Sequence, residues 1–156
     1  MQYPPSVEEV QKLVKQHSKL KALGTRHCFN TIADSKDDLV CSKELNKVIA
    51  LDTLNHTVTV EGGIKYGELA PYLHQHGWAL HNLASLPHIS VGGSITTATH
   101  GSGIKNGNLS SAVTGLEVVI ADGSIVHFSK ADPEKLNAVV VGLGAIGFIT
   151  NVTLQI

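Results

Sequence analysis

The residues best suited to holding a ligand are concentrated in residues 82–103, which read NLASLPHISVGGSITTATHGSG. Gly92 and Gly93 let the backbone approach a ligand closely, and we expect residues 94–98 to form a short helical turn whose free N–H groups attract phosphate. The alternative is a solvated Gly/Ser/Thr-rich surface loop without a ligand. Against it, the stretch carries aliphatic side chains that favour partial burial, namely Leu83, Leu86, Ile89, Val91 and Ile95.

His27 is the second chemical candidate, because a neutral imidazole nitrogen is nucleophilic near pH 7. It stands in the loop GTRHCFN at residues 24–30, directly after the short strand-like run at residues 20–23. A strand that leads into a tight loop directs backbone N–H groups toward phosphate. The alternative is a loop histidine that makes one hydrogen bond.

The remaining histidines and the cysteines do not predict a metal site. His74 and His76 stand two apart, so on a helix they face different directions, and no carboxylate accompanies them at ligand spacing. Cys28 and Cys41 indicate neither a disulfide framework nor a thiolate metal site. Their free thiols favour a reducing compartment, and we expect a cytoplasmic location.

Length and charge restrict the class of protein. A chain of 156 residues fits one domain with its own core. With 12 basic and 13 acidic residues it has no excess of positive charge for nucleic acid. The sequence has neither a long apolar run nor an N-terminal secretory pattern, so we expect no membrane segment.

The spacing of apolar residues predicts helices alternating with short strands. Ser6 and Glu9 form a capping-box pattern ahead of a helix that ends near residues 17–18, and Gly77 ends a second helix at residues 66–75. A third, short helix is expected at residues 133–138. We expect the early strands to form a small mixed sheet; they are residues 20–23, 39–41, 48–51 and 56–61.

The second half of the chain predicts an antiparallel sheet. Asp122-Gly123 is a strong signal for a type I′ hairpin between strands at residues 111–120 and 125–128. The chain ends in a strand at residues 147–156. Residues 142–147 match G-x-G-x-x-G, but a strand pattern follows where a dinucleotide site needs a helix, so we reject a Rossmann site.

Residues 82–103 and 24–30 together resemble the PCMH-type FAD-binding domain of the vanillyl-alcohol oxidase superfamily, most closely its alditol (xylitol) oxidase and aldonolactone (gulonolactone) oxidase branch. The likeness extends from Tyr3 to Ile156. It implies an α+β fold with two subdomains. The small mixed α/β subdomain would cover about residues 1–60, and the larger one, with a mainly antiparallel sheet and flanking helices, about residues 61–156.

The resemblance implies FAD as cofactor and assigns the site residues. His27 matches the histidine that is joined to the flavin 8α-methyl group, although Cys28 replaces a common serine and thiols also tether flavins in some branches. Ser85 would contact the substrate near the reactive edge, or would only cap the turn before Pro87. The implied cofactor-binding residues are Leu23, Gly24, Thr25, Arg26, His27, Cys28, Phe29, Ser85, Leu86, His88, Ile89, Gly92, Gly93, Ser94, Ile95, Thr97, His100, Gly101, Gly144, Gly147 and Ile149.

Some of these assignments leave an alternative open. His88 and His100 would bond to phosphate or flavin, or would only satisfy neighbouring carbonyl groups. Gly144, Gly147 and Ile149 would follow the adenosine side of FAD.

The implied activity is that of an oxidase. A hydroxyl group of a polyol or sugar lactone would be oxidised, and oxygen would be reduced to hydrogen peroxide. Relatives continue into a second domain that covers the flavin, which we expect to be missing from this chain. The alternative is a flavin-binding module without turnover, and a reductase of cell-wall precursor synthesis shares the fold but fits the motifs less well.

Overall fold

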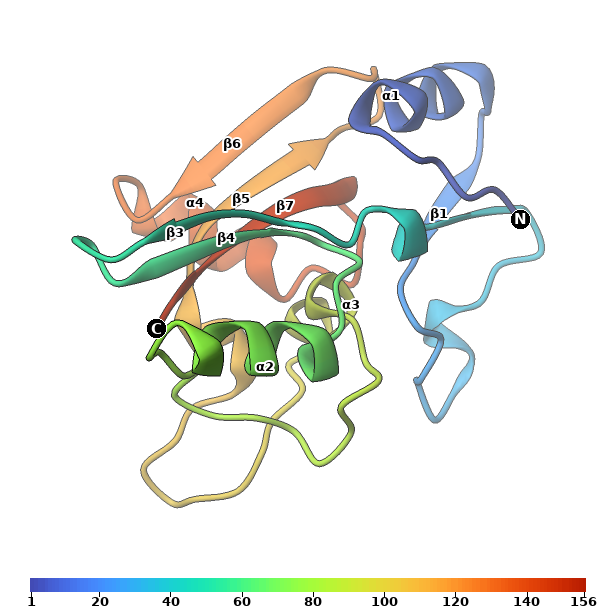
Figure 1. Cartoon of the computed structure of the whole chain (residues 1–156). Coiled ribbons are helices and arrows are strands. Elements are labelled where there is room, and N and C mark those ends of the chain that lie inside the picture. The colour runs from blue at the N-terminus through green and yellow to red at the C-terminus, as the bar shows by residue number, and fades with distance from the viewer.

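The computed structural model describes all 156 residues and contains two β-sheets. A parallel pair joins β1 (Leu20–Leu23) to β2 (Asp38–Cys41). The larger sheet has the order β3-β4-β7-β5-β6, and all its neighbours are antiparallel (Figure 1). Its strands are β3 (Val48–Asp52), β4 (Thr57–Glu61), β5 (Val113–Val119), β6 (Ile125–Ser129) and β7 (Phe148–Gln155).

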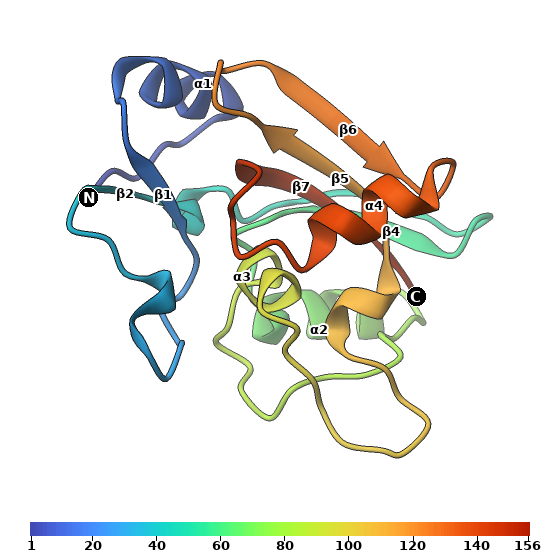
Figure 2. The ribbon, with the colours of Figure 1, turned by 180° about the vertical axis from the view of Figure 1, so that it is seen from behind.

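Four α-helices accompany the sheets (Figure 2). Side chains accept backbone N–H hydrogen bonds at the starts of three of them. The Ser6 hydroxyl accepts from the Glu9 N–H at 3.4 Å, as the capping pattern predicts. The Glu68 carboxylate accepts from the Lys65 N–H, and Asp132 accepts from the Lys135 N–H. The helices are α1 (Val7–Gln16), α2 (Tyr66–Gln75), α3 (Val91–Thr96) and α4 (Pro133–Val140), with 3₁₀ turns η1 (Thr31–Ala33), η2 (Ser42–Glu44) and η3 (Leu109–Ala112).

The main core lies between the five-stranded sheet and the helices α2, α3 and α4. Period-two alternation in β4 buries Val58 and Val60 completely, and α2 contributes the fully buried Leu69 and Leu73. Burying such aliphatic side chains is the dominant favourable term in folding. The sequence prediction of an α+β fold with a mainly antiparallel sheet is confirmed.

A smaller core joins the two sheets into one body. It contains Val10 and Leu13 of α1, Val40 of β2, Leu45, Val119 of β5 and Phe148 of β7. The Gln11 side chain also donates to the Gly123 carbonyl oxygen at 2.7 Å, across the top of the molecule. Because α1 and β2 pack against the ends of β5 and β7 in this way, the end of β1 and the start of β7 can line one site.

The predicted small mixed sheet is wrong. β3 and β4 do not join the parallel pair, because β4 pairs along its whole length with β7 and brings β3 with it. The chain therefore passes from one sheet to the other between β2 and β3. The division into subdomains near residue 60 stays a prediction.

The predicted type I′ turn is also wrong, although the hairpin itself is present. The Gly123 N–H donates to the Ile120 carbonyl oxygen at 2.8 Å, and of the turn residues only Gly123 has a positive φ, +81°. A type I′ turn needs two such residues. In the observed turn, the Asp122 carboxylate accepts a hydrogen bond from the Ser124 N–H at 2.7 Å, which stabilises the turn.

The helices are short. No helix is long and apolar enough to span a membrane.

Candidate functional site

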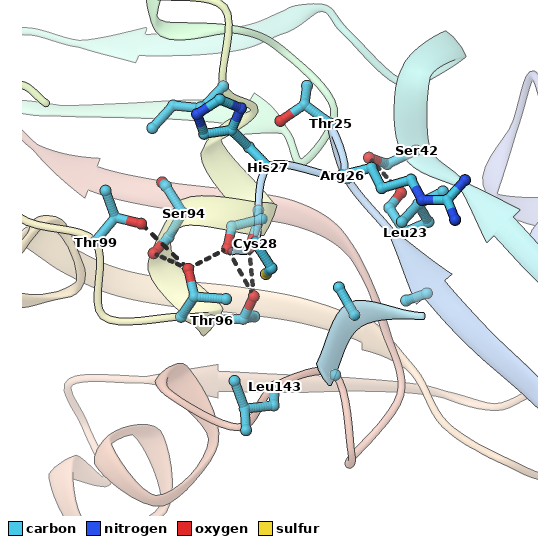
Figure 3. A pocket seen from close by; sticks show the side chains of 18 of the residues that line it. Leu23, Thr25, Arg26, His27, Cys28, Ser42, Ser94, Thr96, Thr99 and Leu143 are labelled. Carbon is cyan, nitrogen blue, oxygen red and sulfur yellow. Dashed lines mark hydrogen bonds between the residues drawn. The ribbon is translucent and has the colours of Figure 1, made fainter. Parts of the chain in front are cut away.

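A cleft of about 640 Å³ lies where the two sheets meet, within the range of roughly 300–1,000 Å³ typical of small-molecule sites. One wall is the loop after β1 together with η1. The opposite wall is α3 with the turn that follows it, and the start of β7 and the preceding turn complete the lining. Figure 3 shows side chains from these segments, including His27, Thr96 and Leu143.

The cleft brings together almost all of the predicted site residues. The lining includes Leu23, Gly24, Thr25, Arg26, His27, Cys28, Phe29, Ser85, Leu86, Ile89, Gly92, Gly93, Ser94, Thr97, His100, Gly144, Gly147 and Ile149. They come from segments that extend from Leu23 to Ile149, across most of the 156-residue chain, so their convergence is a property of the fold.

The other three predicted residues lie outside the lining. Ile95 is fully buried in the main core and so positions α3. A β-carbon on Gly101 would lie 2.1 Å from the Leu83 carbonyl oxygen, so this glycine permits close packing of two loops. The His88 ring lies edge-on to the His27 ring, with centroids 5.0 Å apart. Their roles toward a ligand stay predictions.

Other lining residues were not predicted. Thr96, Ala98 and Thr99 lie within the glycine-rich stretch, and Leu143 lies within the G-x-G-x-x-G match, so a local signal was present for these residues. Ser42 and Gly62 have no such signal, because only the folded chain brings them to the cleft. The remaining members are Lys21, Ala22, Asn30, Ile32, Ala33, Ala84 and Phe148.

Two contacts, from the end of β2 and the start of η2, hold the end of β1 and the first residue of the loop after it. The Ser42 hydroxyl donates to the Leu23 carbonyl oxygen at 3.4 Å, and the Cys41 thiol lies 3.7 Å from the Gly24 carbonyl oxygen. The Leu23 and Gly24 carbonyl groups are therefore held beside the end of β2.

The glycine-rich turn is a helix that begins earlier than predicted. Helix α3 starts at Val91, not Ser94, because Val91 and Ile95 are both fully buried and anchor it. Two of its first N–H groups are used inside the protein, since Val91 donates to Ile64 and Gly92 donates to Gly62 at 2.9 and 2.7 Å. Of the first three, only the Gly93 N–H has no hydrogen-bond acceptor in the chain, and Gly93 lines the cleft.

Gly24 and Gly93 meet in a contact that we call the glycine seam. A β-carbon on Gly24 would lie 3.2 Å from the Gly93 α-carbon, and one on either glycine would approach the Ser90 hydroxyl oxygen to 2.6 or 2.9 Å. Ser90 precedes α3 but makes no capping bond. Its hydroxyl is buried without any hydrogen-bond partner, which is unfavourable unless a ligand or water satisfies it.

Strained backbone is concentrated around the cleft. Three lining residues other than glycine have positive φ angles: Arg26 at +53°, Ala98 at +53° and Leu143 at +51°. Such conformations persist where the surrounding structure enforces them, commonly at ligand sites. The Arg26 guanidinium pairs with Asp34 at 2.6 Å and extends away from Thr96 and Thr99 (Figure 3).

Tyr66 supports α3 from behind. Burial raises the pKa of its hydroxyl to about 12, and the hydrogen bond with Ser94 partly opposes that rise. The two hydroxyl oxygens are 3.0 Å apart, and the Ser94 hydroxyl also donates to the Val91 carbonyl oxygen at 2.8 Å. The tyrosine is therefore neutral at physiological pH and acts through packing and hydrogen bonding.

The chemical character of the cleft fits an elongated ligand with phosphates and flat apolar rings. The free Gly93 N–H, the unpartnered Ser90 hydroxyl and the glycine seam suit phosphate oxygens. Ile32 and Leu143 offer apolar surface elsewhere in the lining. No group of three or more His, Cys, Asp or Glu side chains lies together as metal ligands would.

Sequence relatives agree with this character. The chain is 42% identical over 98% of its length to alditol oxidase from a Streptomyces species, and 37% identical over 97% of its length to L-gulonolactone oxidase from Bos taurus. It is 35% identical to L-gulono-1,4-lactone dehydrogenase from Mycobacterium tuberculosis, over 97% of its length. The chain spans only 36–37% of the length of these relatives.

The fold has a close counterpart among solved structures. An alkyldihydroxyacetonephosphate synthase superimposes with a TM-score of 0.85 over 98% of this chain and 30% of that protein, at 21% identity. Residues 2–129 match the FAD binding domain family. With the fold, the relatives and the phosphate-suited cleft in agreement, this chain belongs to the family of FAD-binding domains of the PCMH type, and its cofactor is FAD.

Proposed function

We propose that this chain is the flavin-binding part of an oxidase that converts a hydroxyl group of a polyol or sugar lactone into a carbonyl group and reduces oxygen to hydrogen peroxide. The observation that carries the proposal is the phosphate-suited seam, with the free Gly93 N–H and the Ser90 hydroxyl, inside a cleft lined by the predicted flavin-contacting residues. The names of the alditol and gulonolactone oxidases support the substrate class.

The chain's own residues would hold FAD in two ways. Gly24 and Gly93 would admit the phosphates close to the backbone, and the Ser90 hydroxyl would gain its missing partner there. Leu143, Gly144 and Ile149 would contact the adenosine side. When bound, FAD supplies a hydride acceptor that can afterwards be reoxidised by oxygen.

Two side chains of the cleft are assigned to the reacting end. Ser85 is exposed in the lining, and its hydroxyl would hydrogen-bond to a substrate hydroxyl and so orient the carbon that loses hydride. His27 would be the covalent attachment point through a ring nitrogen. Further contacts with the substrate would come from the part of the relatives' length that this chain does not span.

The two cysteines bear on the subcellular location of the protein. Cys28 and Cys41 are both free thiols, which suits a reducing compartment. We therefore place the protein in the cytoplasm.

Flavin titration of the purified chain tests the cofactor site. We expect saturable binding of FAD, seen as quenched flavin fluorescence and as a higher melting temperature with excess FAD. Peroxide formation from xylitol or a gulonolactone should be low, because the chain is only part of the relatives' length. Absence of saturable binding would overturn the proposal.

Ser90→Ala and Ser110→Ala form a matched pair for this titration. Both serines are buried, but the Ser110 hydroxyl donates to the Ile95 carbonyl oxygen at 2.9 Å, whereas the Ser90 hydroxyl has no partner. Ser110→Ala should therefore lower the melting temperature of the free chain. Ser90→Ala should leave that temperature equal or higher and weaken FAD binding by roughly tenfold, the equivalent of one hydrogen bond to a charged group.

A further inference from the structure

One segment beside the cleft is attached weakly to the rest of the molecule. Residues 26–37, which we call the flap, connect the parallel strands β1 and β2. Such a crossover is usually a helix packed on the sheet, but the flap contains only the three-residue turn η1 and no buried residue. Figure 1 shows it projecting from the end of β1, beyond both sheets.

The hydrogen bonds of the flap are almost all internal. Arg26 pairs with Asp34, the Ile32 N–H donates to Asn30, and the Asp34 N–H donates to Thr31. One hydrogen bond joins the flap to the rest of the protein, from the Lys21 ammonium group to the Ile32 carbonyl oxygen. A segment with few external bonds and no buried side chains moves at low cost.

The flap also carries apolar side chains that are exposed to solvent. Phe29 is 101% exposed and Ile32 is 45% exposed, yet both line the cleft. In another part of the lining, the turn before β7, Leu143 is 44% exposed. Apolar surface on both sides of a cleft becomes favourable when a flat apolar ring system lies between the walls.

We infer that the flap is a lid that closes over bound FAD and buries Phe29 and Ile32 against it. The internal Arg26–Asp34 ion pair lets the flap move as a unit, hinged at its ends. Thr25 marks the fixed end, because its hydroxyl accepts from the Ser90 N–H at 3.4 Å. This inference rests on the proposed function, since it requires that FAD occupies the cleft.

Limited proteolysis with trypsin measures the closure. Lys36 lies in the flap, and Lys105 lies in an exposed turn outside the cleft lining and serves as the internal reference. Saturating FAD should slow cleavage after Lys36 by about tenfold or more, because cleavage requires the open segment. Cleavage after Lys105 should keep its rate. Slower amide hydrogen exchange in residues 26–37 with FAD is the second expected result.

Phe29→Ser and Ile104→Ser provide matched variants, since Ile104 is equally exposed, at 103%, but lies outside the cleft. Phe29→Ser should weaken FAD binding about tenfold and abolish protection of Lys36, whereas Ile104→Ser should change neither. FAD binding without protection of Lys36, or equal affinities of the two variants, would overturn the lid while leaving the proposed function intact. Failure of the wild-type chain to bind FAD would overturn both.

Discussion

His27 is exposed on the loop after β1 and is the residue that we propose as the covalent attachment point for flavin. Its ring is flanked by His88, with centroids 5.0 Å apart, and by Phe29, with centroids 6.0 Å apart. The neighbouring Cys28 also lines the cleft and is a free thiol. Two nucleophilic side chains therefore lie next to each other in the sequence. Substituting each in turn distinguishes which one binds the flavin covalently.

We predict that His27 is the attachment residue. After reconstitution with FAD and denaturation in acid, the wild-type polypeptide should keep the flavin absorbance through gel filtration. His27→Ala should release all of the flavin, because the variant lacks the imidazole that forms the bond. Cys28→Ser should release none, because it keeps that imidazole. Flavin that stays on the His27→Ala polypeptide, or that the Cys28→Ser variant loses, would assign the bond to the thiol.

The helices and strands contribute different groups to the cleft. The strands β1 and β7 bring backbone to it, whereas α3 presents one free N–H group and two closely packed glycines. Helix α2 contributes no lining residue, but Tyr66 at its start contacts Ser94 of α3. The support of α3 by α2 therefore depends on a buried phenol.

Tyr66 predicts a specific loss of stability at alkaline pH. Its pKa is about 12 in the folded chain, above the ordinary value of 10.0, so the unfolded chain ionises first as the pH rises. Stability should be independent of this group below pH 10 and should fall as pH rises from 10 to 12, by about 2 kcal/mol near pH 11.5.

Urea unfolding of wild type and Tyr66→Phe checks this slope. At pH 8 the variant should be less stable by about 1 kcal/mol, because it loses the hydrogen bond with Ser94. Near pH 11.5 that order should reverse, since phenylalanine does not ionise. If the free energies of unfolding of the two proteins fell in parallel as the pH rises, ionisation of Tyr66 would not be the cause of the loss of stability.

At the scale of the whole molecule, the two sheets share one small core. Val10 of α1 is fully buried there, beside Val119 of β5 and Phe148 of β7. Trp78 packs against the other core, near the end of α2. A change at Val10 therefore reports whether the two parts unfold together.

We predict a single cooperative transition. Val10→Ala removes two buried methyl groups and should cost about 2 kcal/mol, which lowers the melting temperature by roughly 4–8 °C for a chain of this size. Trp78 fluorescence and far-ultraviolet circular dichroism should shift by the same amount. An unchanged Trp78 transition beside a lower circular-dichroism transition would show that the parts unfold separately.

The local pattern of the sequence was sufficient to predict the elements of secondary structure. Period-two alternation marked β4, helical spacing marked α1 and α2, and the glycine at residue 77 marked the end of α2, where φ is +80°. These features depend on neighbours in sequence. The main segments that line the cleft were predictable for the same reason, since residues 24–30, 82–103 and 142–147 each carry a glycine motif.

Contacts between residues distant in sequence decided the strand pairing and part of the cleft lining. The sequence by itself determined the α+β class, the strands and the two glycine-rich segments. Only the tertiary structure decided that β3 and β4 pair with β7, that Ser42 and Gly62 reach the cleft, and that Ser90 is buried without a partner. Strand pairing and hydrogen-bond satisfaction depend on which surfaces meet after folding, whereas periodicity and capping depend on residues a few positions apart.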